Sequence, residues 1–254
     1  MLALGTIPPI EESVLGFLSV FFISASALIL NDYFDLEIDR INSPNRPLPS
    51  GKVSPNDALI LFITITLLGF IASTLLGLAE LIVSILVWGI GFLYNWKYKR
   101  SGLWGNLMVS LSVGMTFIYG AIAVGKPFEK LVWIFSIIAF LIDLGEEIAA
   151  DALDIEGDKL IDSKSIAIMY GQNIALKVSA IIFGSVIVLS IIPFILSWLA
   201  KIYFVPLIVM DVIIAISTVR LLQTENTKKA KDIRRIYISS GTVMGILIIL
   251  RIVL

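Results

Sequence analysis

Eight apolar segments occupy most of this sequence, and each is long enough to form a helix that crosses a lipid bilayer. Such a helix needs about 20 predominantly apolar residues. Only helices and closed barrels satisfy every backbone polar group in lipid, and runs of this length favour helices. We therefore predict an all-α fold, a polytopic transmembrane helical bundle. Its spans lie at roughly residues 10–31, 57–77, 80–97, 103–124, 130–150, 172–197, 201–222 and 234–254.

The composition agrees with a chain that faces lipid. Of the 254 residues, 58% are hydrophobic and 15% are charged, whereas soluble domains carry about 25% charged residues. We expect residues 1–254 to form a single transmembrane domain in a lipid bilayer. The N-terminus lacks the basic region and the cleavage site of a signal peptide. Nothing in the sequence predicts a nucleic-acid partner or an obligate protein partner.

The chain contains neither cysteine nor histidine. The absence of cysteine excludes a disulfide framework, thiolate chemistry and cysteine metal sites. The absence of histidine removes the commonest general base and the commonest transition-metal ligand. Any metal that the chain binds must therefore be held by oxygen atoms.

The distribution of basic residues predicts how the chain is oriented in the membrane. The loops after the first, third, fifth and seventh predicted spans share one side, and the other loops share the second side with both termini. Lys126, Lys130, Lys201 and Arg251 fall on the second side, which leaves 15 of the 19 basic residues on or near the first. Because basic residues concentrate in cytoplasmic loops, we predict that the first side faces the cytoplasm.

The first predicted span ends in a group of polar and acidic residues. Asn31, Asp35 and Asp39 are spaced i, i+4 and i+8. A helix that continues through them places all three on one face, and Asp32 lies beside that face. The sequence therefore predicts an acidic stripe at this end of the span.

The fifth predicted span ends in a second acidic group. Glu147, Asp151, Asp154 and Asp158 are spaced i, i+4, i+7 and i+11, again on one helical face. Asp143, one turn earlier, extends the stripe into the apolar span. Both stripes lie on the predicted cytoplasmic side.

Two acidic stripes at the membrane need a counter-charge. Like charges at i, i+4 destabilise a helix by ~0.2–0.5 kcal/mol per pair, and carboxylates near the bilayer cost several kcal/mol more. Mg²⁺ takes oxygen ligands and binds through one or two carboxylates together with substrate phosphates. The stripes thus predict a Mg²⁺ site, and two ions could bridge a diphosphate. The alternative is that these acids are solvated residues that flank the spans.

Basic residues follow the acidic groups on the same predicted side. Arg46 comes after the first group, and Lys97 and Lys99 end the third predicted span. Basic side chains bind phosphate oxygens well, so acids for a metal and bases for phosphate are typical of a diphosphate site. The alternative is that these residues anchor the chain at the cytoplasmic surface, which is the role that we expect between Lys228 and Arg235.

Asp211 lies in the middle of the seventh predicted span. An acidic residue is costly there and usually faces the interior of the bundle. We expect a bond to a neighbouring helix, and a place in an acceptor pocket is the alternative.

These patterns resemble a known family, the UbiA-type intramembrane prenyltransferases. The sequence ND-x-x-D-x-x-x-D at 31–39, followed by RPLPSG at 46–51, resembles the first family signature. The sequence D-x-x-D-x-x-x-DK at 151–159 resembles the second. The stretch 94–100 and the Gly-Asn pair at 105–106 also lie where the family has such residues. The resemblance covers essentially the whole chain.

The resemblance implies a helical bundle around a central cavity, in which two Mg²⁺ ions bridge a prenyl diphosphate. By the family pattern, the catalytic residues would be Asp35, Asp39, Asp154 and Asp158. The metal ligands would be Asn31, Asp32, Asp35, Asp39, Asp151, Asp154 and Asp158. The diphosphate would be bound by Arg46, Tyr94, Lys97, Lys99 and Asn106. The spacing from Tyr94 to the lysine is one residue longer than is usual in the family, which leaves Lys97 and Lys99 as alternatives.

The N-terminus departs from the family pattern. The family typically has nine spans and carries its first signature at the end of the second. Here the signature ends the first predicted span, and Leu2-Ala3-Leu4-Gly5 resembles the tail of a further helix. We therefore expect the first family helix to be missing from this sequence.

Within the family, the compact loops, the EGDK sequence at 156–159 and the absence of His and Cys look most like the digeranylgeranylglyceryl phosphate synthases. This likeness implies Mg²⁺-dependent transfer of a geranylgeranyl group to geranylgeranylglyceryl phosphate, in archaeal ether-lipid synthesis at the cell membrane. An aromatic acceptor of the 4-hydroxybenzoate or naphthoate type, as in quinone synthesis, is the alternative within the family.

Two other classes of membrane protein use acidic residues. A cation transporter favours ionisable residues at the bilayer midplane and interrupted helices, whereas the acids here lie at helix ends beside basic residues. A phosphotransferase of the CDP-alcohol type carries an Asp-Gly-x-x-Ala-Arg pattern, which this sequence lacks. Both are less favoured than a prenyltransferase.

Overall fold

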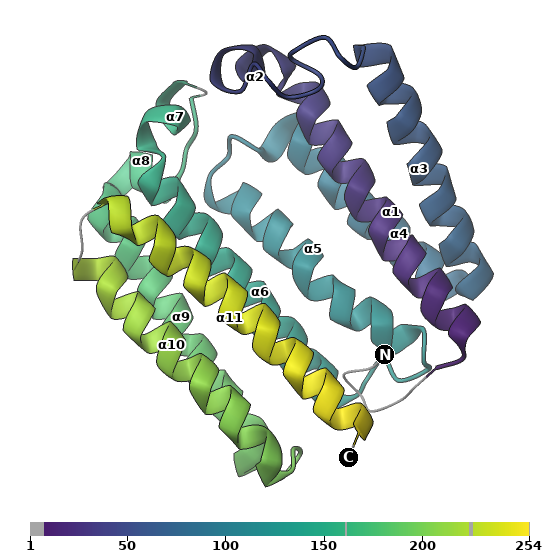
Figure 1. Cartoon of the computed structure of the whole chain (residues 1–254), viewed down its shortest axis with the longest axis vertical. Coiled ribbons are helices and arrows are strands. Elements are labelled where there is room, and N and C mark those ends of the chain that lie inside the picture. The colour runs from purple at the N-terminus through teal and green to yellow at the C-terminus, as the bar shows by residue number, and fades with distance from the viewer. Residues whose placement is uncertain (1–7, 161, 224–225, 254) are drawn as a thin grey trace. The chain divides into compact units, whose positions relative to one another are not determined.

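The computed structural model describes residues 8–160, 162–223 and 226–253, and every regular element in these ranges is a helix (Figure 1). The predicted all-α class is confirmed. The chain divides into two compact units, residues 8–98 and the part from Lys99 onward. The single domain over residues 1–254 stays a prediction.

Each predicted span overlaps a long helix. Seven of these helices are long and apolar enough to cross a membrane. The eighth, α6 (Lys130–Leu153), has 24 residues, but its C-terminal half carries Asp143, Glu146 and Glu147. Because of these charges, α6 is not among the helices that are apolar enough to cross a membrane. Seven apolar spans and one long acidic helix therefore replace the eight apolar spans that were predicted.

In the unit of residues 8–98, α1 (Ile10–Phe34) packs against α3 (Pro55–Leu76) and α4 (Leu78–Leu93). Buried hydroxyl groups join the three helices, because Ser73 Oγ lies 2.6 Å from Ser19 Oγ and 2.7 Å from Ser84 Oγ. Small residues and hydrogen bonds of this kind hold helices together in lipid, where water cannot compete.

In the unit that begins at Lys99, α6 packs against α5 (Leu103–Ile122), α9 (Gln172–Ile195) and α11 (Asn226–Val253). Phe183 of α9 is fully buried against Gly145 of α6, where a Cβ atom would lie 2.7 Å from the ring. Ser179 Oγ donates to the Gly145 carbonyl at 2.7 Å. This close approach fixes α6, and with it the second acidic group, against α9.

The helix α10 (Phe204–Gln223) packs against α9 and α11. Asp211 of α10 accepts a hydrogen bond of 2.7 Å from Ser190 Oγ of α9. The expected bond between Asp211 and a neighbouring helix is thus present, and it gives this residue a structural role.

Helix α11 begins at Asn226, whereas the predicted span begins at residue 234. The additional turns contain Asp232, whose carboxylate is fully buried and pairs with Arg235 at 3.0 Å and with Arg220 of α10 at 3.5 Å. These ion pairs explain why a polar segment extends the helix beyond its apolar part. Residue 254 and the predicted helix tail at 2–5 lie outside the described residues.

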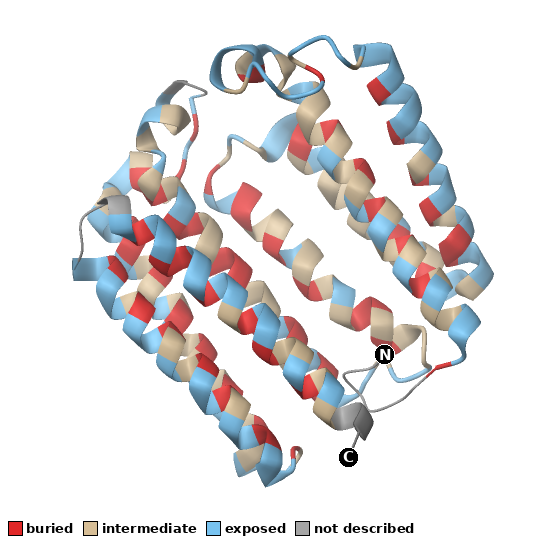
Figure 2. Cartoon of the chain, viewed as in Figure 1, coloured by how far each residue is buried: buried red, intermediate tan, exposed pale blue. Residues whose placement is uncertain are grey.

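Exposed residues occur all along the spans (Figure 2), and many of them are large and apolar. Leu75 on α3, Ile181 on α9 and Val205 on α10 are 66%, 70% and 68% exposed. Exposed apolar surface of this extent is unfavourable in water and is expected where lipid surrounds the helices. The chain is therefore a multi-pass membrane protein.

Candidate active site

The first acidic group lies where α1 gives way to the short helix α2 (Leu36–Asn42). The helix does not continue unbroken as expected, because Asp35 forms a bend between α1 and α2 with φ −87° and ψ 0°. The backbone bonds from Asp35 to Asn31 (2.9 Å) and from Asp39 to Asp35 (2.8 Å) persist across the bend. The i, i+4 relation of the three residues is therefore kept although the helix is interrupted.

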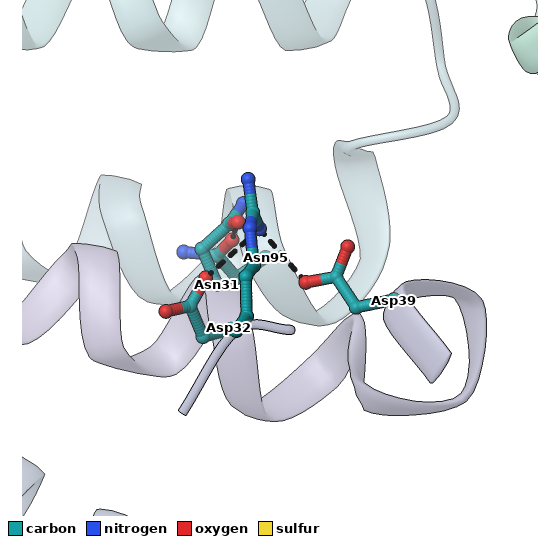
Figure 3. Close-up of polar contacts among 5 residues, drawn as sticks. Asn31, Asp32, Asp39 and Asn95 are labelled. Atoms are coloured by element: carbon teal, nitrogen blue, oxygen red, sulfur yellow. Dashed lines mark hydrogen bonds and ion pairs between the residues drawn. The ribbon is translucent and has the colours of Figure 1, made fainter. Parts of the chain in front are cut away.

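Arg46 neutralises part of this group. The loop after α2 turns back, with Arg46 N donating to Ser43 O at 3.0 Å. Arg46 Nη1 then reaches Asp39 Oδ2 at 2.8 Å and Asp32 Oδ1 at 3.4 Å. Figure 3 labels these two aspartates. The Asp39 side chain is 11% exposed, whereas those of Asp32 and Arg46 are each 50% exposed. The predicted phosphate ligand Arg46 thus lies between two of the predicted metal ligands.

The predicted phosphate ligands Tyr94 and Lys97 lie in a π-helical turn, Tyr94–Tyr98, that follows α4. The exposed Lys97 places its ammonium nitrogen 5.7 Å from the centre of the Tyr98 ring. Lys99 follows this turn and begins the second unit. The structure therefore leaves both lysines as alternatives for the phosphate-binding role.

Asn95, in the same turn, was missed by the sequence analysis. It is 8% exposed, and its Oδ1 accepts a hydrogen bond of 3.1 Å from Asn31 Nδ2 (Figure 3). An amide at the end of an apolar span, four residues after Gly91, is the signal that could have identified it.

The second acidic group lies where α6 ends. Asp154 interrupts the helix with φ −112° and ψ 38°, and α7 (Ile155–Leu160) follows. Asp154 Oδ1 accepts a bond of 3.3 Å from Gly157 N, so the side chain stabilises the new helix start. As in the first group, the predicted continuous stripe is broken at one of its acids.

Asn106 of α5, which the resemblance gives as a diphosphate ligand, contacts the second acidic group. Its Nδ2 donates to Asp151 Oδ2 at 2.9 Å, and one turn along α5 Ser110 Oγ donates to Asp143 Oδ2 at 2.9 Å. Two rungs of hydrogen bonds therefore join α5 to the acidic face of α6. Asn106 is thus a hydrogen-bond donor to a carboxylate of the second group, and its contact with a phosphate stays a prediction.

Asp158 has an incomplete set of partners. Its Oδ2 atom is buried and has no hydrogen-bond partner among the described residues. Burial raises the pKa of the Asp158 carboxyl, Ser165 and Ser163 offset part of the rise through hydrogen bonds, and repulsion from Asp154 adds to it. A buried carboxylate oxygen without a donor is costly unless a cation binds to it.

The loop after α7 is tied to the start of α5. Lys164 N donates to Arg100 O at 3.0 Å. Gly102, with φ +64°, lies so close to Lys164 O that no Cβ atom would fit. Only glycine satisfies both requirements, so this position permits the close contact between the loop after α7 and the start of α5.

The donor set agrees with magnesium bound together with a substrate. Within residues 8–160, 162–223 and 226–253, no three acidic side chains lie close enough to form a metal site by themselves. Mg²⁺ keeps several waters and uses one or two carboxylates plus substrate phosphates, so a cage of protein ligands is not required. The unpartnered Asp158 Oδ2 and the all-oxygen ligands fit that mode of binding.

An apolar cavity of about 370 Å³ lies among α5, α6, α10 and α11. Phe117, Phe135 and Met244 are among its lining residues, and Asp143, Tyr237 and Ser240 are its polar members. The sequence analysis did not identify Tyr237 or Ser240. A cavity that is mostly apolar with a few polar groups suits a hydrocarbon chain that carries a polar end.

Comparisons with known proteins agree over nearly the whole chain. The model described as the UbiA prenyltransferase family matches residues 1–241. The digeranylgeranylglyceryl phosphate synthase of Thermococcus sibiricus is 37% identical over 233 residues, which cover 92% of this chain and 82% of that protein. That of Methanosphaera stadtmanae is 33% identical over 238 residues, which cover 92% and 85%.

Solved structures share the fold. A structure of digeranylgeranylglyceryl phosphate synthase has a TM-score of 0.83 and 30% identity, and the match covers 100% of this chain and 90% of that one. A UbiA homologue from Archaeoglobus fulgidus bound to GPP and Mg²⁺ has a TM-score of 0.72 over 100% and 92% of the two chains. Its identity is 18%, so this second likeness concerns the fold alone.

Proposed function

Because the chain belongs to the UbiA prenyltransferase family, we propose that it transfers a geranylgeranyl group from geranylgeranyl diphosphate to geranylgeranylglyceryl phosphate. The observation that carries the proposal is the pair of acidic groups at helix ends, one with Arg46 among its acids and one with an unpartnered buried oxygen at Asp158. Relatives that are 33–37% identical over 92% of the chain and bear this activity in their names support the acceptor.

The metal ligands come from both groups in this proposal. Asn31, Asp35 and Asp39 would hold one Mg²⁺ ion, with Asp32 beside them. Asp151, Asp154 and Asp158 would hold a second ion. Bound Mg²⁺ supplies positive charge that neutralises the leaving diphosphate. The number of ions bound per chain tests whether each group holds one.

The basic residues would bind the phosphate oxygens. Both ion pairs of Arg46 use Nη1, so its other guanidinium nitrogens can donate to a phosphate while the acids stay neutralised. Tyr94 and either Lys97 or Lys99 would complete the phosphate contacts. Asn106 holds Asp151 in place, which orients that carboxylate for a cation.

The chemistry begins with ionisation of the allylic C–O bond, since donors fixed around the diphosphate stabilise the charge that develops on it. An apolar pocket excludes water, which would otherwise capture the carbocation. The acceptor hydroxyl then attacks the cation and loses its proton. With no histidine in the chain, a carboxylate, the released diphosphate or water must accept that proton.

The positive-inside distribution supports a cytoplasmic location for the site. The 15 basic residues assigned to one side lie on the side of both acidic groups. Labelling of single cysteines introduced at exposed positions such as Glu156 of α7 in inside-out vesicles tests this orientation. The chain contains no other cysteine that would react.

A radiometric transfer assay on the purified full chain tests the function. Geranylgeranyl diphosphate and Mg²⁺ would be supplied with either geranylgeranylglyceryl phosphate or 4-hydroxybenzoate. We expect a labelled product with the glycerol phosphate and no product after chelation of the metal. Product with the benzoate alone would move the protein to the aromatic branch. Cation flux through proteoliposomes without a prenyl donor would contradict the proposal.

A further inference from the structure

The side chain of Asn95 bridges two helices in the unit of residues 8–98. Its Nδ2 atom donates to the backbone carbonyl of Gly91 in α4 at 3.0 Å and to that of Ala27 in α1 at 3.2 Å. The helices approach closely at this point, since a Cβ atom on Gly91 would lie 3.4 Å from Ala27 Cβ. Asn95 is therefore buried at a helix contact with both of its amide hydrogens engaged.

These contacts determine the orientation of Asn95. A backbone carbonyl oxygen can only accept a hydrogen bond, so the nitrogen of Asn95 must face Gly91 and Ala27. Its oxygen must then face Asn31, where it lies 3.1 Å from Asn31 Nδ2 (Figure 3). An acceptor at that position requires a donor opposite it.

The orientation of the Asn31 amide follows from that of Asn95. Its amide can meet the Asn95 oxygen only through Nδ2, so Oδ1 is the Asn31 atom that is not used by Asn95. A cation requires an oxygen ligand, and a rotated amide would direct N–H groups toward it instead. Two backbone carbonyls thus fix the orientation of Asn31 through one intermediate side chain.

We propose that Asn95 is a positioning residue that orients the Asn31 carboxamide so that its oxygen can bind the metal ion. The inference rests on the proposed function, in which Asn31 is a metal ligand. Residues behind the ligands commonly set ligand orientation, and their loss lowers metal affinity by about 10–100-fold. Asn95 lies in the π-helical turn Tyr94–Tyr98, from which its side chain contacts both helices.

A comparison of two backgrounds tests the proposal. Asn95→Ala would be introduced into the natural chain and into an Asn31→Asp variant. A carboxylate presents two equivalent oxygens and needs no amide orientation. We expect Asn95→Ala to weaken metal binding about 10-fold or more in the natural chain and not to weaken it in the Asn31→Asp background. Binding of Mn²⁺ in the presence of inorganic diphosphate, followed by electron paramagnetic resonance, measures the affinity without any transfer reaction.

Two further variants separate positioning from packing. Asn95→Leu keeps most of the volume and tests the lost hydrogen bonds if the alanine variant does not fold. Ser84→Ala removes a buried hydrogen bond of α4 that is distant in sequence from the motif, and we expect it to lower the melting temperature without changing Mn²⁺ affinity.

The outcomes distinguish this proposal from the proposed function. An equal loss of affinity in both backgrounds would assign Asn95 a purely structural role and overturn the inference. The inference also fails if Asn95→Ala has no effect while Asn31→Ala weakens binding, although the metal site then stands. Absence of Mn²⁺ binding to the natural chain would overturn the metal site itself and the inference with it.

Discussion

The two acidic groups differ in how their negative charge is balanced. In the first group, Arg46 pairs with Asp39 at 2.8 Å and with Asp32 at 3.4 Å. In the second group, no ion pair to Asp151, Asp154 or Asp158 occurs within the part of the chain that the structure describes. Asn106 and the backbone of Gly157 donate neutral hydrogen bonds there instead.

The stability of the two groups therefore depends on a bound cation to different degrees. An arginine that is part of the chain neutralises part of the first group before any ligand arrives. Hydrogen bonds stabilise the second group only in part, because Asp158 Oδ2 is buried without a partner among the described residues. We therefore expect metal binding to stabilise the second group more than the first.

The largest expected effect comes from Asp158→Asn. Loss of a metal ligand should lower kcat/KM by at least about 100-fold, more than the loss of a residue that only supports a ligand. The matched control is Glu156→Gln, which changes an exposed acid two residues away, and it should retain activity. Full activity of Asp158→Asn in the transfer assay would exclude Asp158 as a ligand.

The metal-free stability of the same variant checks that its fold is intact. Burial gives the Asp158 carboxyl a higher pKa in the folded state than in the unfolded state. The ionised carboxylate therefore opposes folding, and stability is lost as the pH rises through these two pKa values. At pH 7 we expect the metal-free Asp158→Asn variant to melt at the same temperature as the natural chain or higher.

An intermediate effect is expected from Arg46→Ala, and only the affinity for the prenyl diphosphate should fall. Loss of charge-assisted bonds to phosphate should raise the KM for the prenyl diphosphate about 10-fold. Loss of the guanidinium should leave the affinity of the first group for Mg²⁺ unchanged or higher, since Asp32 and Asp39 no longer have a competing cation.

Arg40→Ala is the control for Arg46→Ala, because Arg40 is exposed and pairs only with Glu37 of the same helix among the described residues. It should change neither readout. If Arg46→Ala lowers both affinities together, Arg46 maintains the shape of the first group and does not bind phosphate.

The smallest expected effect is a difference in hydrogen exchange on removal of the metal. A ligand at a few times its Kd shifts the equilibrium between the open and the closed form of the segment that binds it about fivefold toward the closed form. Chelation should therefore speed exchange at Asp151–Lys159 by about that factor, with a smaller change at Asn31–Arg46. Equal changes of the exchange rate in the two segments, measured by mass spectrometry, would contradict the expected difference between the two acidic groups.

The helical spans could be predicted well because the apolar runs are long and uninterrupted. Limits such as Ile10, Lys130 and Gln172 lie within a residue or two of their predicted positions. The start of α11 was placed eight residues late, since the ion pairs of Asp232 depend on Arg220 in another helix. Tertiary contacts of this kind leave no periodic signal in the sequence.

The candidate site could be predicted in its composition but only in part in its geometry. The i, i+4 spacing predicted that the acids of each group lie on one continuous helix. In the structure, Asp35 interrupts the helix of the first group and Asp154 that of the second. Aspartate competes for backbone donors and favours helix starts, as Asp154 does with Gly157 N. The pairing of Arg46 with Asp39 follows from the fold of a proline-rich loop, which spacing alone does not describe.

The π-helical turn Tyr94–Tyr98 has a consequence for how this sequence changes during evolution. A π turn accommodates one extra residue within a helix without breaking it. An insertion there would be absorbed locally, so that α4 and the residues after the turn keep their own structure. Deletion of one residue should restore an ordinary α-helical turn, which makes this point of the chain a natural place for lengths to differ among relatives.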